Sequence, residues 1–450
     1  GGNRCLDAFN TALSHACDGG DTRWYASTLE LQLASLELCR ACRRVPTLHV
    51  RVDENTPRSL WSPRKSQTRP ITRSSKVRIW SRVPVVRALS LTWALPLEVL
   101  HQRAAVELWT WLELLRLRRG PSSLRGRKSV VWPSKRLKDL VLEMEIDQTI
   151  AGVVWPASLQ QVSFGARFNQ PIAGMVWPAA MKQLAFGHDF NQPIDGIAWP
   201  ASLQRLSFGK SFNQPVAGVV WPASLQQLSF GSKFNQSVAA VVWPTLLKKL
   251  SFGTLFNQPI AGVVWPPSLQ YLLFGYGFNQ PIAEVVWPAA MNQLVFGHHF
   301  NQPIAGVEWP VTMKQVVFEH CFNQPIVEVV WPAAMKQLKL GYSFNQPMVR
   351  LVWPASLQQL ELGHFFNQPI AGVVWPTSLQ QLWLGDWFNQ PIAGVVWPNS
   401  LPRLSFGKSF NQPIAGVVWP NSLPQLSFGE SFNQPIAEVV WPASLLRLSF

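Results

Sequence analysis

Apolar residues recur at a fixed interval over the last two thirds of the chain. The dipeptide Trp-Pro returns every 22 residues from Trp155 to Trp441, and the Asn of the phrase Phe-Asn-Gln keeps the same interval from Asn169 to Asn433. Most intervals contain two prolines and a glycine, so a helix cannot run through them. The pattern therefore predicts a short unit without helices that is repeated many times.

One repeat unit shows where its strand lies. Leu159, Val162 and Phe164 are apolar, and the polar Ser163 separates the last two, which is the alternation of a short strand. A glycine follows and predicts a turn. The segment Ile172–Trp177 predicts a second extended piece, because a residue before proline favours extended backbone. Each unit is therefore expected to form a strand, a turn, an extended return and a corner.

A single 22-residue coil offers too few apolar side chains to offset the entropy of ordering it. Stacking on neighbouring coils buries both faces of each coil and pairs the strands, so the array is predicted to be a solenoid. A degenerate first copy begins at Trp132-Pro133. We therefore expect an all-β-rich, leucine-rich-repeat-like solenoid over residues 131–450, preceded by a small helical or disordered segment over residues 1–130.

The repeat phrase carries a family resemblance. The units read L-x-x-L-x-F-G-x-x-F-N-Q-P-I, followed by W-P-x-S-L, which resembles the FNIP repeat, a relative of the leucine-rich repeats. The family usually has Leu before the proline of the P-x-S-L segment, where this chain has Trp. The resemblance implies a protein-interaction solenoid, and such proteins often carry an F-box.

The N-terminal third differs in composition from the repeats. Of the formal charge of +15, residues 1–150 contribute +11 and residues 151–450 contribute +4. Thr22–Arg44 and Leu95–Arg119 are helix candidates. We interpret the basic excess as a solvated or disordered arm; the alternative is attraction to nucleic acid or acidic membranes, and a nucleic-acid partner is not expected. No apolar run approaches the roughly 18 to 20 residues of a membrane span.

The stretch Leu95–Leu100, LPLEVL, resembles the opening of an F-box. It supports a second hypothesis, in which the chain is a substrate adaptor of a ubiquitin ligase; a plain capping helix before the first coil is the alternative. Gly1-Gly2 resembles the middle of a longer sequence and Phe450 lies inside a repeat. We therefore expect the chain to be a fragment.

The five cysteines do not form a disulfide framework, because the 300 residues of repeat contain only Cys321. This usage favours a reducing, intracellular compartment. Cys39 and Cys42 form a lone CxxC. Zinc needs four ligands at set spacings, which Cys5, Cys17 and His15 do not clearly provide, so no metal site is assigned there.

The invariant columns favour structure over chemistry. A catalytic site is singular, whereas the Asn column has more than a dozen copies, so its amides are expected to satisfy backbone groups at a turn. The Trp column is expected to fill a core corner; a stripe that binds sugar rings is the alternative. The sequence has no paired carboxylates, phosphate loop or triad. It therefore predicts neither an enzyme nor a cofactor.

The two residues between the glycine and Phe-Asn vary from coil to coil. His298, His299, His320 and Cys321 fall in adjacent coils, about 5 Å apart if stacked. They provide a third hypothesis, in which the protein binds zinc or copper through a His/Cys cluster. The alternative is an exposed, variable turn.

The outward strand position is Ser or Ala in the first and last coils but large, apolar or charged in the middle ones. A cluster of this kind on a Ser/Gln face predicts a protein-binding patch, whereas drift among recent duplicates is the alternative. The main hypothesis is therefore a non-catalytic protein-interaction scaffold. Its candidate contact residues are Tyr271, Leu273, Tyr276, Val295, His298, Val317, His320, Lys339, Tyr342, Glu361, His364, Trp383 and Trp387.

Overall fold

Strands are the regular elements of the computed structural model, which describes residues 47–51, 88–92, 114–117, 136–142 and 153–450. Described residues up to Phe164 belong to one compact unit, and Gly165–Phe450 form a second. Within the described ranges there is no helix, and hence none that is long and apolar enough to cross a membrane. The predicted division at residue 130 falls between described segments and stays a prediction.

The first unit contains five strands that pair in parallel, each with the next along the chain. They are β1 (Thr47–Arg51), β2 (Ala88–Thr92), β3 (Leu114–Leu117), β4 (Asp139–Leu142) and β5 (Gln161–Phe164). The helix predicted over Leu95–Arg119 is therefore wrong at β3. The alternation Leu115-Arg-Leu117 matches Leu140-Val-Leu142 in register and explains the strand. Thr22–Arg44 and the F-box-like stretch Leu95–Leu100 lie outside the described residues.

The second unit is a parallel β-solenoid of coils 22 residues apart, which confirms the predicted fold. Each strand pairs with the next in register, for example Leu250 opposite Leu272. The strands are β6 (Gln183–Ala185), β7 (Arg205–Ser207), β8 (Gln227–Ser229), β9 (Lys249–Ser251), β10 (Tyr271–Leu273), β11 (Gln293–Val295), β12 (Gln315–Val317), β13 (Gln337–Lys339), β14 (Gln359–Glu361), β15 (Gln381–Trp383), β16 (Arg403–Ser405), β17 (Gln425–Ser427) and β18 (Arg447–Ser449).

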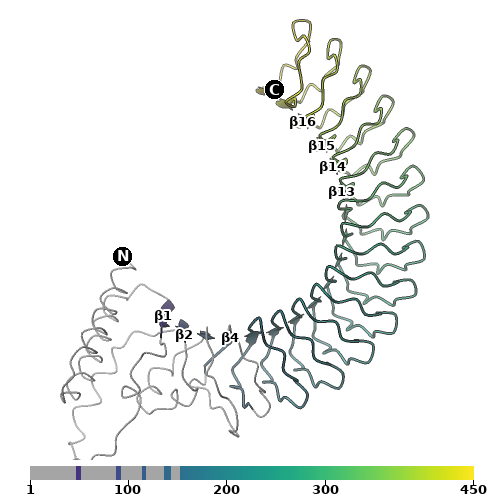
Figure 1. Ribbon diagram of the computed structural model, residues 1–450. Helices are drawn as coiled ribbons and strands as arrows, with labels where there is room; N and C mark the ends of the chain where they lie inside the picture. Colours follow the sequence, from purple (N-terminus) through teal and green to yellow (C-terminus); the bar gives the residue numbers. More distant parts are fainter. Residues whose placement is uncertain (1–46, 52–87, 93–113, 118–135, 143–152) are drawn as a thin grey trace, which may run out of the picture. The chain divides into compact units, whose positions relative to one another are not determined.

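The coils of this second unit follow an arc with the strands on its inner edge and the rest of each coil projecting outward (Figure 1). The core lies between these two sides. In the coil of β9 it is filled by Leu247, Leu250, Phe252, Phe256 and, closing the coil, Trp265, all buried. Phe252 and Phe256 stack with ring centroids 4.0 Å apart. Such aromatic layers supply the burial that a single coil lacks.

The Asn column forms a hydrogen-bonded ladder, as predicted. The backbone N–H of each Asn donates to the side-chain oxygen of the Asn one coil earlier, as from Asn279 to Asn257 at 2.9 Å. The next Gln side chain, here Gln280, donates to the same oxygen at 3.0 Å. Twelve such backbone links run from Asn169 to Asn433. The column is therefore structural.

The Trp column lies in the core, again as predicted. Trp265 is 6% exposed, and its ring lies 6.4 Å from that of Trp287. These rings are therefore not available as a sugar-binding stripe. From Trp199 to Trp419, the indole N–H groups of this column are buried and have no hydrogen-bond partner.

The glycine after each strand permits close contact between coils. A Cβ at Gly253 would overlap the carbonyl group of Gly231 in the preceding coil. Glu319 is the one exception to this glycine column among residues 165–450. The exception falls in the coil that also carries His320 and Cys321.

Candidate binding surface and metal-ligand cluster

Three outward columns cover the strand side of the second unit. In the coil of β8 they are Gln226, Gln227 and Ser229, which surround the buried Leu228. We call the corresponding positions of all coils from β6 to β18 the strand face. It lies on the inner edge of the arc, because the strands do (Figure 1).

The candidate strand residues lie side by side on this face. The strand register places Leu273 opposite Val295, then Val317, Lys339, Glu361 and Trp383 in successive coils. Most of them are partly exposed, as is Tyr271 at the first strand position. Burial raises the pKa of the Tyr271 phenol.

Val317 differs from its neighbours, because it is only 8% exposed. Its neighbours in the column are Val295 and Lys339, whose side chains are larger than the Ser of other coils. Val317 therefore offers little surface to a partner and packs among the other candidate strand residues. Lys339 and Glu361 form an ion pair at 3.5 Å.

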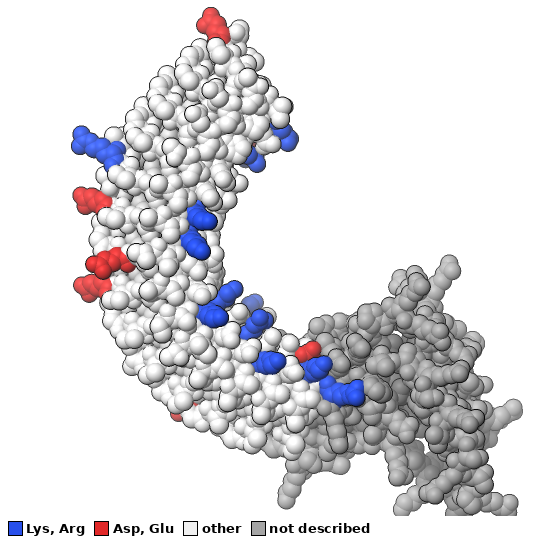
Figure 2. Space-filling view, turned by 180° about the vertical axis from the view of Figure 1, so that it is seen from behind, with Lys and Arg blue, Asp and Glu red and all other residues white. Residues whose placement is uncertain are grey.

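The strand face is strongly basic. Figure 2 shows most visible Lys and Arg along the inner edge of the arc and most visible Asp and Glu along the outer edge. Within residues 165–450, all of which are described, the strand face carries nine cations and one acid, Glu361. The cations are Lys182, Arg205, Lys248, Lys249, Lys314, Lys336, Lys339, Arg403 and Arg447.

The candidate turn residues form a second column beside the strand ends. Their rings stack nearly parallel from Tyr276 through His298, His320 and Tyr342 to His364, with centroid separations of 4.1, 4.1, 4.5 and 4.2 Å. His364 is paired with Asp386 at 3.0 Å. Trp387 is exposed beside the last of these and packs its ring edge-on against Phe365 at 4.9 Å.

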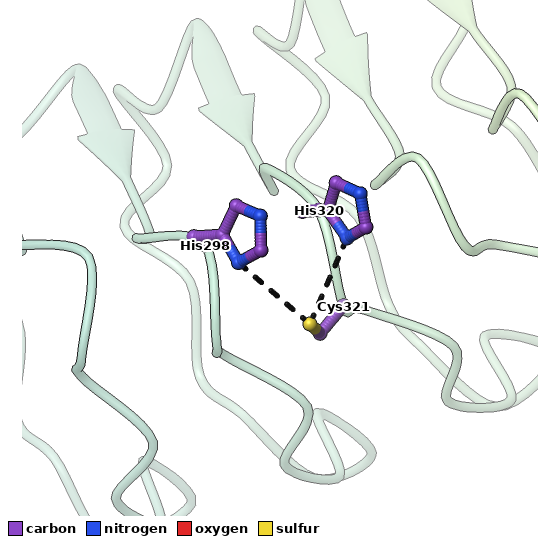
Figure 3. Close-up of side chains that lie close together, drawn as sticks. All are labelled: His298, His320 and Cys321. Carbon is purple, nitrogen blue, oxygen red and sulfur yellow. Dashed lines mark hydrogen bonds between the residues drawn. The ribbon is translucent and has the colours of Figure 1, made fainter.

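Three residues of the predicted His/Cys cluster come together. The Cys321 sulfur lies 3.9 Å from Nδ1 of His298 and 3.8 Å from Nδ1 of His320, and the three ligand atoms lie within 4.8 Å of one another (Figure 3). All three residues are partly exposed. His299, the fourth member of the prediction, is exposed and tilted by 49° against His298, with ring centroids 5.3 Å apart. The structure thus brings three of the four residues into one group.

The surroundings of His298 favour the neutral form of its imidazole. Burial lowers the pKa of this imidazole, and the neighbouring His320 and His299 lower it further, while the carboxylate of Glu319 acts in the opposite direction. A neutral imidazole is the form that can ligate a metal ion.

One surface feature, a stripe of exposed valines, was not predicted from the sequence. The valine directly before each Trp is exposed, as Val242 is at 80%, whereas the preceding Val241 is buried. The extended backbone turns successive side chains to opposite sides, so only one valine of each Val-Val pair enters the core. The exposed valines form a stripe that Ala198 and Glu308 interrupt. The alternation of side chains along an extended segment was the signal in the sequence that predicts this stripe.

The stacked coils place the second unit in the class of leucine-rich-repeat-like solenoids. A family model described as the FNIP repeat matches more than half of the chain. The chain therefore belongs to the FNIP repeat family, as its phrase predicts. The matched residues are 168–211, 190–233, 212–255, 234–277, 256–297, 322–365, 366–409 and 410–450.

One solved structure agrees with this assignment. CroV588, described as a novel circular LRR protein, is 37% identical with a TM-score of 0.68; the match covers 81% of this chain and 56% of that one. The chain thus spans about half the length of CroV588. An internalin, InlF from Listeria monocytogenes, is 12% identical with a TM-score of 0.47, over 65% of this chain and 86% of that one. No curated protein matches the chain.

Proposed function

We propose that this protein is a non-catalytic scaffold that binds a protein partner on the strand face of its middle coils, from β10 to β15. Of the thirteen candidates named above, the seven on the strand face form the main contact, with Val317 buried among them, and the six of the turn column lie beside it. The partner presents an acidic segment with apolar side chains. Leucine-rich-repeat-like solenoids generally act as interaction scaffolds, and their curved faces provide extended binding surfaces.

One observation carries this proposal: the middle coils carry large side chains on the strand face where the outer coils have Ser, whereas their core substitutions, Leu340, Leu362 and Leu384 in place of Phe, stay apolar and buried. The third strand position is Ser from Ser207 to Ser251 and again from Ser405 to Ser449. Between these runs the large side chains, ending at Trp383, occupy the same position. The core beneath them stays apolar and buried in every one of these coils. A change from small polar to large side chains on an accessible face is typical of a binding site.

The charge of the strand face supports an acidic partner. Lys248 and Lys249 lie on one side of the apolar patch, and Lys314 and Lys336 lie within it, all four exposed. The only acid of the face, Glu361, is already paired with Lys339. Cations around an apolar centre steer an acidic partner and fix its orientation, while the buried anchors provide most of the affinity.

Two matched triple variants test this proposal. The first changes Leu273, Val295 and Trp383 on the strand face to Ser. The second changes Val264, Val286 and Val374 of the exposed valine stripe to Ser, which are 81%, 83% and 79% exposed. Both remove three accessible apolar side chains from the same coils. The partner is recovered with the wild-type chain, produced recombinantly, and its Kd is then measured with all three proteins.

We expect the valine-stripe variant to bind like the wild type and the strand-face variant to lose at least about 10-fold in affinity, because truncated anchors each cost 1 kcal/mol or more. We also expect the wild-type affinity to fall with added salt. Equal affinity of all three proteins would reject the strand face as the binding site.

A further inference from the structure

We propose that His298, His320 and Cys321 form a zinc-binding site on the edge of the solenoid. The site shares His298 and His320 with the candidate partner contacts named above, but its evidence is the geometry of the turn column and does not depend on a partner. It uses two imidazoles and one thiolate, with a fourth position left for water or another side chain.

The 22-residue period is what brings these ligands together. His298 and His320 occupy the same slot of adjacent coils, and Cys321 follows in the next slot. The Cys321 N–H donates to the His298 carbonyl at 2.8 Å, and the Ser343 N–H donates to the His320 carbonyl at 2.8 Å. These backbone bonds fix the turns relative to one another, so the ligands are positioned before any ion binds.

The distances are close to those of a bound zinc ion. Zn–S bonds of about 2.3 Å and Zn–N bonds of about 2.0–2.1 Å at tetrahedral angles place S and N about 3.5–3.6 Å apart. The two observed distances between sulfur and nitrogen are 3.9 and 3.8 Å. A contraction of about 0.3 Å brings both S–N distances to these values. The two ligand nitrogens, which with the sulfur lie within 4.8 Å of one another, must approach to about 3.3–3.4 Å.

The rings also show what must move. The imidazoles of His298 and His320 are stacked with an angle of 14° between their planes. A metal ion lies in the plane of each imidazole that binds it, so both rings must turn toward the sulfur. Tyr276 and Tyr342 stack on their outer sides at 4.1 and 4.5 Å and limit this movement to a partial rotation.

The donor set selects the kind of ion. A thiolate with two imidazoles suits zinc and copper(I), whereas calcium and magnesium prefer oxygen ligands. Three protein ligands with an open fourth position are a common zinc arrangement. The exposed His299 is next to the cluster, with its ring 5.3 Å from that of His298, and Glu319 stands at the position where every other coil between Gly165 and Gly429 has glycine. Both supply further donors for the fourth position.

The test uses full-length, tag-free chain in which Cys39 and Cys42 are changed to Ser, so that the lone CxxC cannot bind the metal. Zinc is measured after dialysis, and Co²⁺ is used as a coloured substitute whose thiolate bond gives a charge-transfer band. Variants Cys321→Ser and His320→Gln are compared with His188→Gln, which changes the same turn slot in a distant coil.

We expect one zinc per chain, a thiolate band with Co²⁺, and a higher unfolding temperature when zinc is added. Cys321→Ser and His320→Gln should weaken binding by at least the roughly 10- to 100-fold that losing an outer-shell partner costs, and His188→Gln should leave it unchanged. Circular dichroism without metal shows whether each variant is folded.

Three results would overturn the proposal. One is the absence of bound zinc in this protein. Another is zinc binding that Cys321→Ser leaves unaltered. The third is binding of copper(I) without zinc, which would contradict the assignment of the ion.

Discussion

The middle coils, from β10 to β15, and the coils on either side of them have apolar, buried interiors that differ mainly in Leu340, Leu362 and Leu384 in place of Phe, but their exteriors differ in kind. Phe278 in the middle and Phe212 in an outer coil are both fully buried in the same stack of rings. At the surface, Ser207 of the outer coil corresponds to Trp383 of the middle region. Packing between adjacent coils constrains the interior, whereas the strand face is free to vary. Function is therefore to be sought where these two regions differ.

The largest expected loss of unfolding free energy should be the same in the middle coils and in the outer coils. Phe278→Ala should cost about 3–5 kcal/mol, because it leaves a cavity beside Phe274, whose ring centroid is 4.0 Å away. Phe212→Ala should cost a similar amount, since Phe208 lies 4.1 Å away. Urea unfolding of both variants measures this. A cost below about 1 kcal/mol in only one region would show that the two interiors are not equivalent.

The Asn ladder should have the next largest effect. Asn279 accepts from the backbone N–H of Asn301 at 2.9 Å and from the side chain of Gln302 at 3.1 Å. Asn279→Ala should cost about 1–3 kcal/mol, because it leaves a backbone donor without its partner. Gln302→Ala removes only one of the donors and should cost less. Chemical denaturation distinguishes them; equal costs would indicate that the backbone bond contributes little.

The buried indole N–H groups predict a smaller effect. Trp265 is 6% exposed and its Nε1 has no partner. In Trp265→Phe the loss of ring area is offset by removing this unpaired donor, so the unfolding free energy should change by no more than about 1 kcal/mol. Trp419→Phe in an outer coil should behave alike. Differential scanning calorimetry checks both. A loss above about 2 kcal/mol would mean that the N–H has a favourable contact.

The smallest expected effects are the coupling free energies of two ion pairs, one in the middle coils and one in the outer coils. Lys339 and Glu361 are 3.5 Å apart with side chains 41% and 45% exposed, whereas Lys408 and Glu430 are 3.9 Å apart and 66% and 82% exposed. Double-mutant cycles should give a coupling of about 0.2–1 kcal/mol for the first pair and a value near zero for the second. A stronger coupling in the more exposed pair would contradict this order.

Much of the solenoid could be predicted because its period is strict. The 22-residue interval implies stacking, and stacking implies that the Asn and Trp columns repeat one contact. Strands β1, β2 and β3 were not predicted, because the N-terminal region has no such period. They begin at Thr47, Ala88 and Leu114, at unequal intervals, so self-comparison does not detect them. Their Leu-x-Leu alternation, as at Leu89 and Leu91, was the available signal.

The candidate site was harder to predict than the fold. Which positions face outward follows from alternation, but the exposure of one side chain depends on its neighbours in the adjacent coils. Val317 is buried for that reason, although Val295 beside it is partly exposed. Likewise, the period places His298 next to His320, but only the conformation of the turn decides that Cys321 joins them and His299 does not.

The central claim is that the middle strand face binds the partner and the rest of the solenoid supports it. Its most direct test is the Kd of the recovered partner for the strand-face variant, Leu273→Ser, Val295→Ser and Trp383→Ser, against the valine-stripe variant. The account predicts a loss of at least about 10-fold for the first and none for the second. Equal binding by both, or a loss confined to the valine stripe, would contradict it.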